Sequence, residues 1–327
     1  MGARDSEAQS VRVWALTGAV FALPIALVRV TIWQPDRAVS ELEVRWAPPP
    51  STFVEIAGLR VHLRDQGIRR DVHPIVLLHG SGGSLHTWTG WAEGLARHHR
   101  VVTFDMPGFG LTGPRPDADY SVEAYVAFLT HLLDDLGIER AILVGRAIGG
   151  ETAWRFALSH PARVEKLVLV ASGGYRVESR SEPVAFRIAR SPMLSWLSQR
   201  ILPRSVVARS LRQLYGRPET VGDALVDRYF ELSLRAGNRR AITEQRAQLR
   251  PGNMAHRILE VRVPTLILWG ERDALFPVHM AERFHRDIQG SQLVTFPGLG
   301  HLLQEEDPAA TLPVVERFVS SPVPTGS

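Results

Sequence analysis

Short apolar runs alternate with longer amphipathic stretches along most of the chain. Each run is continuous and rich in Val, Ile and Leu, which is typical of strands buried on both faces of a parallel sheet. The stretches between the runs have the spacing of helices. The pattern predicts an α/β fold with a mostly parallel central sheet and helices on both faces. The runs read PIVLLHG, RVVTFDMPG, ERAILVG, VEKLVLVAS, TLILWGERD and SQLVTFPG.

The segment from Phe53 to Asp65, FVEIAGLRVHLRD, has a different pattern. Apolar and polar residues alternate on either side of Ala57 and Gly58. Alternation interrupted by a small residue and a glycine predicts two antiparallel strands joined by a tight turn. We expect this hairpin to precede the parallel part of the sheet.

The N-terminus carries a long apolar segment over residues 13–33, interrupted by Arg29. Its length approaches the roughly 20 residues that a membrane-spanning helix needs, provided that the arginine reaches the interface. We therefore expect an uncleaved signal anchor and a membrane-associated protein. A cleaved signal peptide of a secreted or periplasmic protein, or an apolar helix docked on a cytoplasmic one, are the alternatives. Arginines flank both ends of the segment, so the membrane side stays open.

Composition narrows the classes of function. The chain has 327 residues, a formal net charge of +4 and no cysteine, and Lys166 is its one lysine. Without cysteine, disulfides, thiolate catalysis and cysteine-bound metals are excluded. The arginines form no basic run interleaved with aromatic residues, so we expect no nucleic-acid partner. Neither a phosphate-binding loop nor a dinucleotide fingerprint occurs, and we expect neither cofactor nor metal.

The carboxyl ends of the predicted parallel strands are where an α/β protein places its site. The first strand ends in a glycine-rich turn, HGSGGS, whose backbone N–H groups can turn inward toward an anion. The second ends at Asp105, which we interpret as a turn residue held by its own side chain.

The third strand end is Gly145 to Gly150, GRAIGG, between the strand AILV and the helix ETAWRFALSH. A strand, a sharp turn with small residues and a helix form the context of the nucleophile elbow, Gly-x-Ser-x-Gly. Ala147 stands where that motif has its serine.

Two further strand ends supply an acid and a histidine in the order that elbow enzymes use. Asp273 follows LILWGER, and His301 follows FPGLG after the last predicted strand. Each residue alone is weak evidence, because an aspartate there is commonly a turn residue and a histidine commonly lies at the surface. Together, downstream of an elbow, they indicate a catalytic acid and base.

These motifs closely resemble those of the α/β-hydrolase superfamily, in its serine esterase and lipase-like, cap-bearing form. The resemblance covers roughly Ser51 to Val319 and lies in HGSGGSLHTW, DMPGFGLT, GRAIGG, WGERDALFP and GLGHLLQEEDP. It implies that position 147 is the nucleophile position, that His301 is the general base and that Asp273 orients it. It also implies an oxyanion hole made by the backbone N–H groups of Ser81 and Ile148. Three further residues are expected against the substrate: Gly80, Gly82 and Trp88.

The resemblance also implies a domain organisation. Residues 1–50 would form the N-terminal apolar segment and a linker, and residues 51–176 with 253–327 the α/β-hydrolase core. Residues 177–252, rich in arginine and with helix-breaking prolines at Pro183, Pro192, Pro203 and Pro218, would form a helical cap inserted after the sixth strand.

Ala147 departs from the family pattern. Alanine has no lone pair to attack a carbonyl, so acyl-enzyme chemistry cannot run through it. An engineered serine-to-alanine change that traps substrate explains why the other catalytic elements remain. A natural pseudoenzyme, or water activated by His301, are the alternatives.

The first functional hypothesis is a carboxylic ester hydrolase that uses Ser, His and Asp on a small or lipid-like monoester, in a form inactivated by Ala147. The HGSGG motif also resembles the meta-cleavage-product hydrolases, which break carbon–carbon bonds, and these are the rival class. A natural ligand-binding pseudoenzyme is the third hypothesis. The expected partner is a small-molecule ester, and the oligomeric state stays open.

Overall fold

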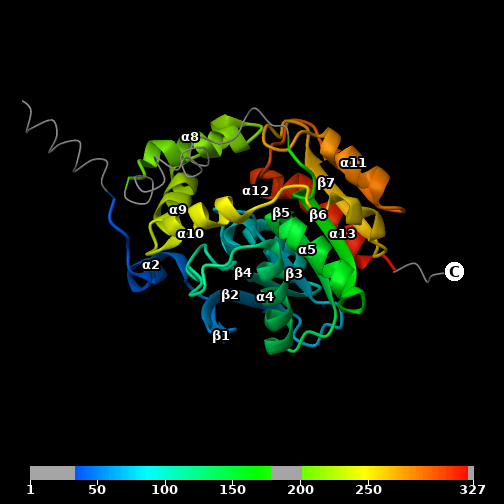
Figure 1. Ribbon diagram of the computed structural model, residues 1–327, viewed down its shortest axis with the longest axis horizontal. Coiled ribbons are helices and arrows are strands. Elements are labelled where there is room, and N and C mark those ends of the chain that lie inside the picture. The colour runs from blue at the N-terminus through cyan, green and yellow to red at the C-terminus, as the bar shows by residue number, and fades with distance from the viewer. Residues whose placement is uncertain (1–33, 178–200, 323–327) are drawn as a thin grey trace, which may run out of the picture.

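The computed structural model describes residues 34–177 and 201–322, which form an eight-stranded sheet flanked by helices (Figure 1). The strand order is β1-β2-β4-β3-β5-β6-β7-β8. β1 pairs with β2 and β2 with β4 in antiparallel fashion, and the other neighbours are parallel. The predicted mostly parallel sheet is therefore confirmed. The strands are β1 (Thr52–Ile56), β2 (Leu59–Gly67), β3 (Ile75–Leu78), β4 (Arg100–Phe104), β5 (Ala141–Ala147), β6 (Val164–Ser172), β7 (Thr265–Gly270) and β8 (Gln292–Phe296).

Burial explains why the apolar runs became strands. Every residue of β3, β5, β6 and β7 is buried, as expected for strands covered on both faces. The predicted hairpin is β1 and β2, and its turn residues Ala57 and Gly58 have φ values of 50° and 74°. Positive φ at both central positions gives the turn a twist that matches the twist of the two strands.

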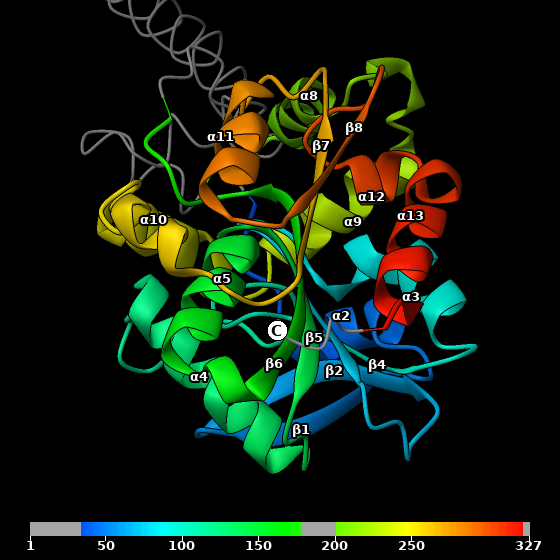
Figure 2. The ribbon, with the colours of Figure 1, turned by 90° about the vertical axis from the view of Figure 1, so that its right-hand side faces the viewer.

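Helices cover both faces of the sheet (Figure 2). One face carries α3 (Thr89–Leu95) and α13 (Pro308–Ser320), and the other carries α4 (Val122–Asp135), α5 (Ile148–Ser159) and α11 (His279–Asp287). The short α12 (Leu303–Glu306) precedes α13. Side chains cap two of these helices: Ser121 accepts a hydrogen bond from the N–H of Ala124, and Asp307 accepts one from Ala310. Short 3-10 turns lie at η1 (Leu85–Trp88), η2 (Pro161–Arg163), η3 (Pro218–Thr220) and η4 (Ala255–Glu260).

Lys166 attaches the end of α13 to the sheet. Its side chain is buried in β6, and its Nζ donates to the carbonyls of Phe318 at 3.0 Å, Val319 at 2.7 Å and Ser321. Phe318 and Val319 lie in the last turn of α13 and Ser321 follows it, at the end of a helix where carbonyls lack their usual intrahelical donors. Ser321 itself donates to the Phe318 carbonyl, from its N–H at 3.3 Å and from Oγ at 2.7 Å. The ammonium group therefore adds a charged donor to the end of the helix, with a bond of 2.7 Å to the carbonyl of the buried Val319.

We expect Lys166→Met to lower the free energy of unfolding by about 2–4 kcal/mol, because buried carbonyls lose a charged donor. Denaturant unfolding measures the loss, and amide exchange should rise first in α13. Arg317→Met is the matched control, because Arg317 also lies in the last turn of α13 but is exposed. Equal stability losses in the two variants would contradict this role for Lys166.

Three helices come between β6 and β7 in the sequence and lie over the carboxyl ends of the strands (Figure 1). They are α8 (Arg204–Leu214), α9 (Asp223–Ser233) and α10 (Asn238–Gln248). They fall within the predicted cap, whose residues 178–200 lie outside the described residues. The cap has a small core of its own, and Leu302 of the main body packs into it. That core contains Val207, Ala208, Leu211, Tyr215, Val221 and Val226.

Part of the predicted N-terminal linker is an ordered helix, α2 (Val39–Trp46), packed against the cap. Leu42 is buried with Leu111 and Leu232. Glu231 of α9 accepts hydrogen bonds from Arg45 at 2.5 Å and from the indole of Trp46 at 2.8 Å. The helix thus links cap and core, an arrangement that its short polar sequence did not reveal.

The structure corrects the prediction of a membrane-associated protein. Among the described residues, no helix combines the length and the apolar character needed to cross a bilayer. The apolar segment that motivated the prediction, residues 13–33, lies outside the described residues. The membrane anchor is therefore not retained.

Candidate active site

The predicted elbow forms where β5 meets α5. Ala147 has φ 50° and ψ −116°, a conformation that costs a non-glycine residue about 1–3 kcal/mol. The turn is tight enough to require its glycines. A Cβ on Gly145 would lie 2.3 Å from the carbonyl oxygen of Gly149, and a Cβ on Gly149 would lie 2.4 Å from that of Leu78. The chain keeps the strain of a nucleophile elbow although alanine gains no chemistry from it.

Asp273 and His301 lie together at the ends of β7 and β8. His301 Nδ1 donates to Asp273 Oδ2 at 2.7 Å, and both side chains are buried. The second carboxylate oxygen accepts the backbone N–H groups of Leu275 at 2.9 Å and Phe276 at 2.8 Å. The carboxylate is thereby fixed, and it orients the imidazole so that Nε2 faces away from Asp273. This is the arrangement of a general base held by its acid.

Among the described residues, the backbone N–H groups of the two predicted oxyanion donors are left unpaired. Within the described chain, no turn, loop or side-chain hydrogen bond uses the backbone N–H of Ser81 or of Ile148. Ile148 begins α5, a helix of 12 residues whose first N–H groups and dipole favour negative charge. The turn that carries Ser81 is closed by a hydrogen bond of 3.0 Å from Gly83 N to the Gly80 carbonyl.

A buried histidine lies under this turn. His79 donates from Nδ1 to the Gly80 carbonyl at 2.8 Å, and its Nε2 accepts the N–H of Met106 at 2.9 Å. Burial lowers the pKa of His79 to about 4. The ring is therefore neutral at physiological pH, as it must be to donate with one nitrogen and accept with the other.

Asp105 joins three segments of the core. Its carboxylate accepts hydrogen bonds from the N–H groups of Leu85 and Leu111 and from His62 Nδ1, each at 2.7 Å, and it is fully buried. Asp105 therefore does more than hold its own turn. Through Leu85 it also fixes the start of the 3-10 turn η1, which follows the glycine-rich loop.

The cap reaches the glycine-rich turn that carries Ser81 through Gln245 of α10. Ser81 Oγ donates to Gln245 Oε1 at 2.6 Å, and Gln245 Nε2 donates to Tyr125 Oη at 2.8 Å. The tyrosine in turn donates to the Pro107 carbonyl at 3.1 Å. This chain of bonds fixes the turn between cap and core.

We expect Gln245→Leu to lower kcat of a serine-bearing form (Ala147→Ser) by about 10²-fold, since small misplacements of catalytic groups have effects of that size. Steady-state kinetics at saturating substrate measures it. Gln248→Leu is the control, because Gln248 lies on the same helix but holds Tyr120 and Ala118 instead. A Gln248 variant as impaired as the Gln245 variant would show that general cap disruption explains the loss.

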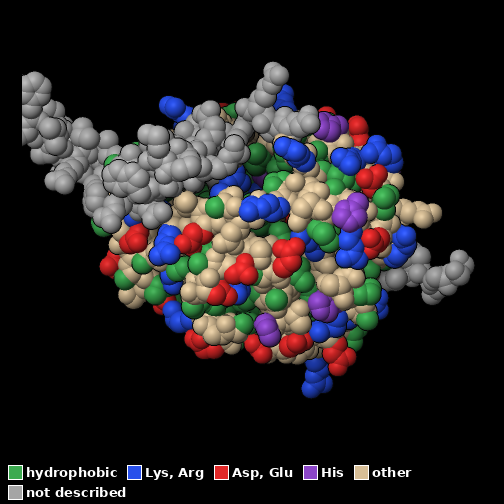
Figure 3. All heavy atoms as spheres, in the orientation of Figure 1, with side chains coloured by type: hydrophobic (Ala, Val, Ile, Leu, Met, Phe, Trp, Pro, Cys, Tyr) green, Lys and Arg blue, Asp and Glu red, His purple; other side chains and the backbone are tan. Residues whose placement is uncertain are grey.

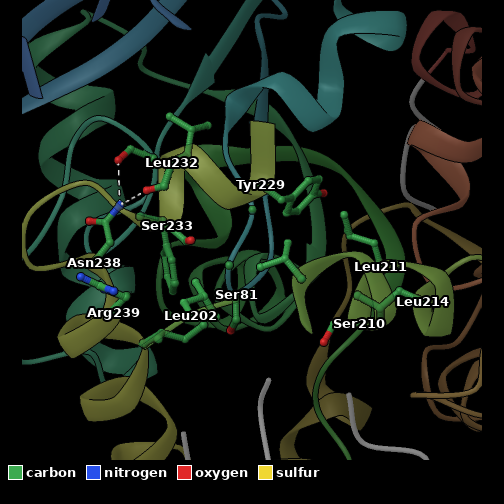
Figure 4. Close-up of a pocket in the computed structure, with 16 residues that line it drawn as sticks. Ser81, Leu202, Ser210, Leu211, Leu214, Tyr229, Leu232, Ser233, Asn238 and Arg239 are labelled. Atoms are coloured by element: carbon green, nitrogen blue, oxygen red, sulfur yellow. Dashed lines mark hydrogen bonds between the residues drawn. The ribbon is translucent and has the colours of Figure 1, made fainter. Parts of the chain in front are cut away.

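A pocket of about 940 Å³, including its open mouth, lies between the glycine-rich turn that carries Ser81 and the cap (Figure 4). Asn238 shapes one wall by donating to the carbonyls of Gly110 at 2.9 Å and Leu232 at 2.8 Å. Most of the wall is apolar, which suits a ligand with an apolar body. Its lining residues include Ser81, Gly82, Phe109, Leu202, Val207, Leu211, Leu214, Tyr229, Leu232, Arg239 and Ile242.

Of the residues expected against the substrate, only Gly82 lines this pocket. Trp88 is fully buried in the main core, with its ring centroid 5.4 Å from that of Trp91. Gly80 lies against the elbow, where a Cβ would be 3.1 Å from the Cβ of Ala147. Tyr229 and Gln245 were not predicted, because contacts between cap and core cannot be inferred from the spacing of residues within one helix.

On the face shown in Figure 3, acidic and basic side chains are interspersed. Across residues 34–177 and 201–322, no three His, Cys, Asp or Glu side chains are grouped so that they could hold a metal ion.

Comparison with known proteins identifies a family and several relatives. A family model described as alpha/beta hydrolase fold matches residues 73–308. An uncharacterized protein of Mycobacterium tuberculosis is 32% identical over 302 residues, covering 85% of this chain and 83% of its own. The 2-hydroxy-6-oxo-2,4-heptadienoate hydrolase of Pseudomonas putida is 30% identical over 279 residues, covering 82% of this chain and 96% of its own.

Among solved structures, the chain is similar to a meta-cleavage product hydrolase from Pseudomonas fluorescens. The TM-score is 0.71 at 26% identity, and the match covers 82% of this chain and 96% of that one. That structure is of an alanine-for-serine mutant complexed with acetates.

Proposed function

This chain belongs to the α/β-hydrolase family, and from that premise we propose that its pocket is built for a meta-cleavage product, a dienoate hydrolysed at a carbon–carbon bond. The observation that carries the proposal is the similarity to the Pseudomonas putida hydrolase, which extends over 82% of this chain. Ester hydrolysis, the first hypothesis from the sequence, requires the same machinery. The named relatives favour the carbon–carbon bond over the ester.

The residues supply each step once a nucleophile is present. In a form with serine at position 147, His301 would take the hydroxyl proton as the oxygen attacks the ketone carbon of the substrate. The N–H groups of Ser81 and Ile148 would hold the oxyanion. When the carbon–carbon bond breaks, the departing carbon takes the proton from His301. Water, activated by His301, then hydrolyses the acyl-enzyme and restores the serine.

With Ala147 in place, the chain binds such a substrate without forming an acyl-enzyme. We propose that alanine stands in for a serine, because the strained elbow and the bonded Asp273–His301 pair are both retained. A natural pseudoenzyme had no reason to keep either feature.

The test uses 2-hydroxy-6-oxohepta-2,4-dienoate, a conjugated compound whose absorbance falls as it is hydrolysed. We expect the Ala147 chain to bind it and leave it intact, and the Ala147→Ser form to consume it. The control substrate is p-nitrophenyl butyrate, which should be the poorer substrate by kcat/KM. Faster ester hydrolysis with an untouched dienoate would overturn the proposal in favour of an esterase. If the Ala147→Ser form bound the dienoate but turned over neither compound, the proposal would be overturned in favour of a binding protein.

A further inference from the structure

Glu306 of α12 is a buried carboxylate whose two oxygens bind backbone N–H groups of two separate segments. Its side chain is fully buried. Oε2 accepts the N–H of Gly216 at 3.0 Å and that of Gly300 at 2.9 Å, and Oε1 accepts the N–H of Arg217 at 2.8 Å. Hydrogen bonds to a carboxylate are stronger than those between neutral groups. Gly216 and Arg217 belong to the cap, whereas Gly300 directly precedes His301, so one side chain binds the cap and the loop of the base together.

The two segments also contact each other directly. The cap turn, residues 214–217, joins α8 to η3. The Leu214 carbonyl accepts the backbone N–H of His301 at 2.7 Å. A Cβ on Gly300 would lie 2.4 Å from both the nitrogen of Gly216 and the carbonyl oxygen of Leu214. Backbone therefore meets backbone with no side chain between, and we expect a shift of the cap turn to move the loop of the base with it.

The ring and the backbone of His301 are held by different groups. Nδ1 of the ring binds Asp273 at 2.7 Å, and the ring of Phe276 lies edge-on to it, with the centroids 5.0 Å apart. These contacts orient the ring, while the bonds of Glu306 and of the cap turn hold the backbone that carries it. A catalytic group displaced by about 1 Å can lose two orders of magnitude in rate. Both anchors are therefore needed to place the base.

We propose that Glu306 is the positioning residue of His301: by binding the cap turn and the loop of the base together, it makes the position of the base depend on the position of the cap. The inference rests on the proposed function only in taking His301 as the base. Glu306 is not among the described residues that line the pocket, so it can act on the reaction through His301 alone. The neighbouring Glu305 instead binds Tyr229, which does line the pocket.

The first test is proton NMR of the full, unaltered chain, without substrate. The Nδ1 proton that His301 shares with Asp273 should give a far-downfield signal, assigned by its absence from His301→Gln. The reference is the proton that His62 shares with Asp105, in a second buried pair at the same 2.7 Å. In Glu306→Gln the amide offers one acceptor oxygen in place of two. Saturation transfer from water should then show at least about tenfold faster exchange of the His301 proton, since a hydrogen bond to a charged group contributes that much. The His62 proton should be unchanged.

Asp307→Asn is the matched control. Asp307 follows Glu306 in the chain and also binds Arg217, but through the guanidinium Nη2 at 3.1 Å and not through the backbone. Asparagine can keep the N-cap of α13 that the aspartate supplies. Both protons should exchange in this variant as they do in the unaltered chain. If Glu306→Gln fails to fold, Glu306→Asp replaces it, because the shorter carboxylate keeps the charge but cannot hold both segments, and the same selective change is expected.

Kinetics in the serine-bearing form give a second readout. Glu306→Gln should lower kcat for the dienoate by at least about tenfold and leave KM unchanged, as expected when the base is misplaced and the pocket is not. A raised KM with unchanged kcat would overturn the positioning role.

The exchange test also has results that would overturn the proposal. Equal acceleration of the His301 and His62 protons would show general loosening of the fold. No acceleration of the His301 proton, or the same acceleration in Asp307→Asn, would show that the carboxylate of Glu306 does not position the base. The exchange test needs no substrate, so its result stands whether or not the dienoate is turned over.

Discussion

Ala147→Ser is expected to raise turnover of the dienoate by on the order of 10⁶-fold, the size of the loss when a serine nucleophile is removed from a complete triad. The reason is that the other parts of the site already have the geometry that the reaction needs. The elbow already has the strained backbone that a nucleophile needs, and His301 is already fixed by Asp273. A serine side chain would replace one hydrogen of the alanine methyl group and would require no rearrangement. Initial rates from the loss of substrate absorbance measure the gain.

The control for that gain is a second change in the serine-bearing form. Asp273→Asn should lower kcat by about 10⁴-fold, because the amide favours the wrong tautomer of His301. Unaltered activity after this change would show that turnover runs through some other group. A serine form no faster than the alanine form would instead leave the pocket as a binding site.

Asp105→Asn is expected to lower the free energy of unfolding by about 3–5 kcal/mol, the usual effect of removing one partner from a buried ion pair. The amide keeps the size of the side chain, so the change tests charge and hydrogen bonding and not volume. Three buried donors, including His62, would face a weaker or wrongly oriented acceptor. Urea unfolding at neutral pH measures the loss.

The pH dependence gives this prediction a second readout. Burial alone would raise the pKa of Asp105, but the charge of His62 and its hydrogen bond outweigh burial and lower it to about 2. A folded-state pKa below the ordinary value of about 4 means stability that is present above pH 4 and lost as pH falls toward 2. The difference between the unaltered chain and Asp105→Asn should therefore shrink over that window. Asp135→Asn, an exposed carboxylate on α4, should change stability by less than about 0.5 kcal/mol throughout.

The sheet and the positions of the candidate acid and base at its edge could be predicted from the sequence, because both depend on local patterns. Continuous apolar runs are dictated by burial on both faces, and the runs at Ile75, Ala141 and Thr265 became strands at nearly the predicted bounds. Parallel strands bring their carboxyl ends to one edge, so residues just after them, such as Asp273 and His301, were expected near one another. The structure places these two within hydrogen-bond distance.

Features that depend on docking were not predictable in the same way. The apolar contact of α2 is made by Leu42 with residues distant in the sequence, Leu111 and Leu232. Gln245 looks like any polar residue on a cap helix until Ser81 lies opposite it.

Lys166 has a practical consequence for chemical labelling. It carries the one lysine amine in the sequence, and in the folded chain that amine is buried and donates to three carbonyls. Acylating reagents that attack free amines can modify this side chain only when α13 detaches from the sheet. The rate of lysine acylation is therefore a single-site clock for the opening of the C-terminal helix, readable by mass spectrometry without any introduced probe.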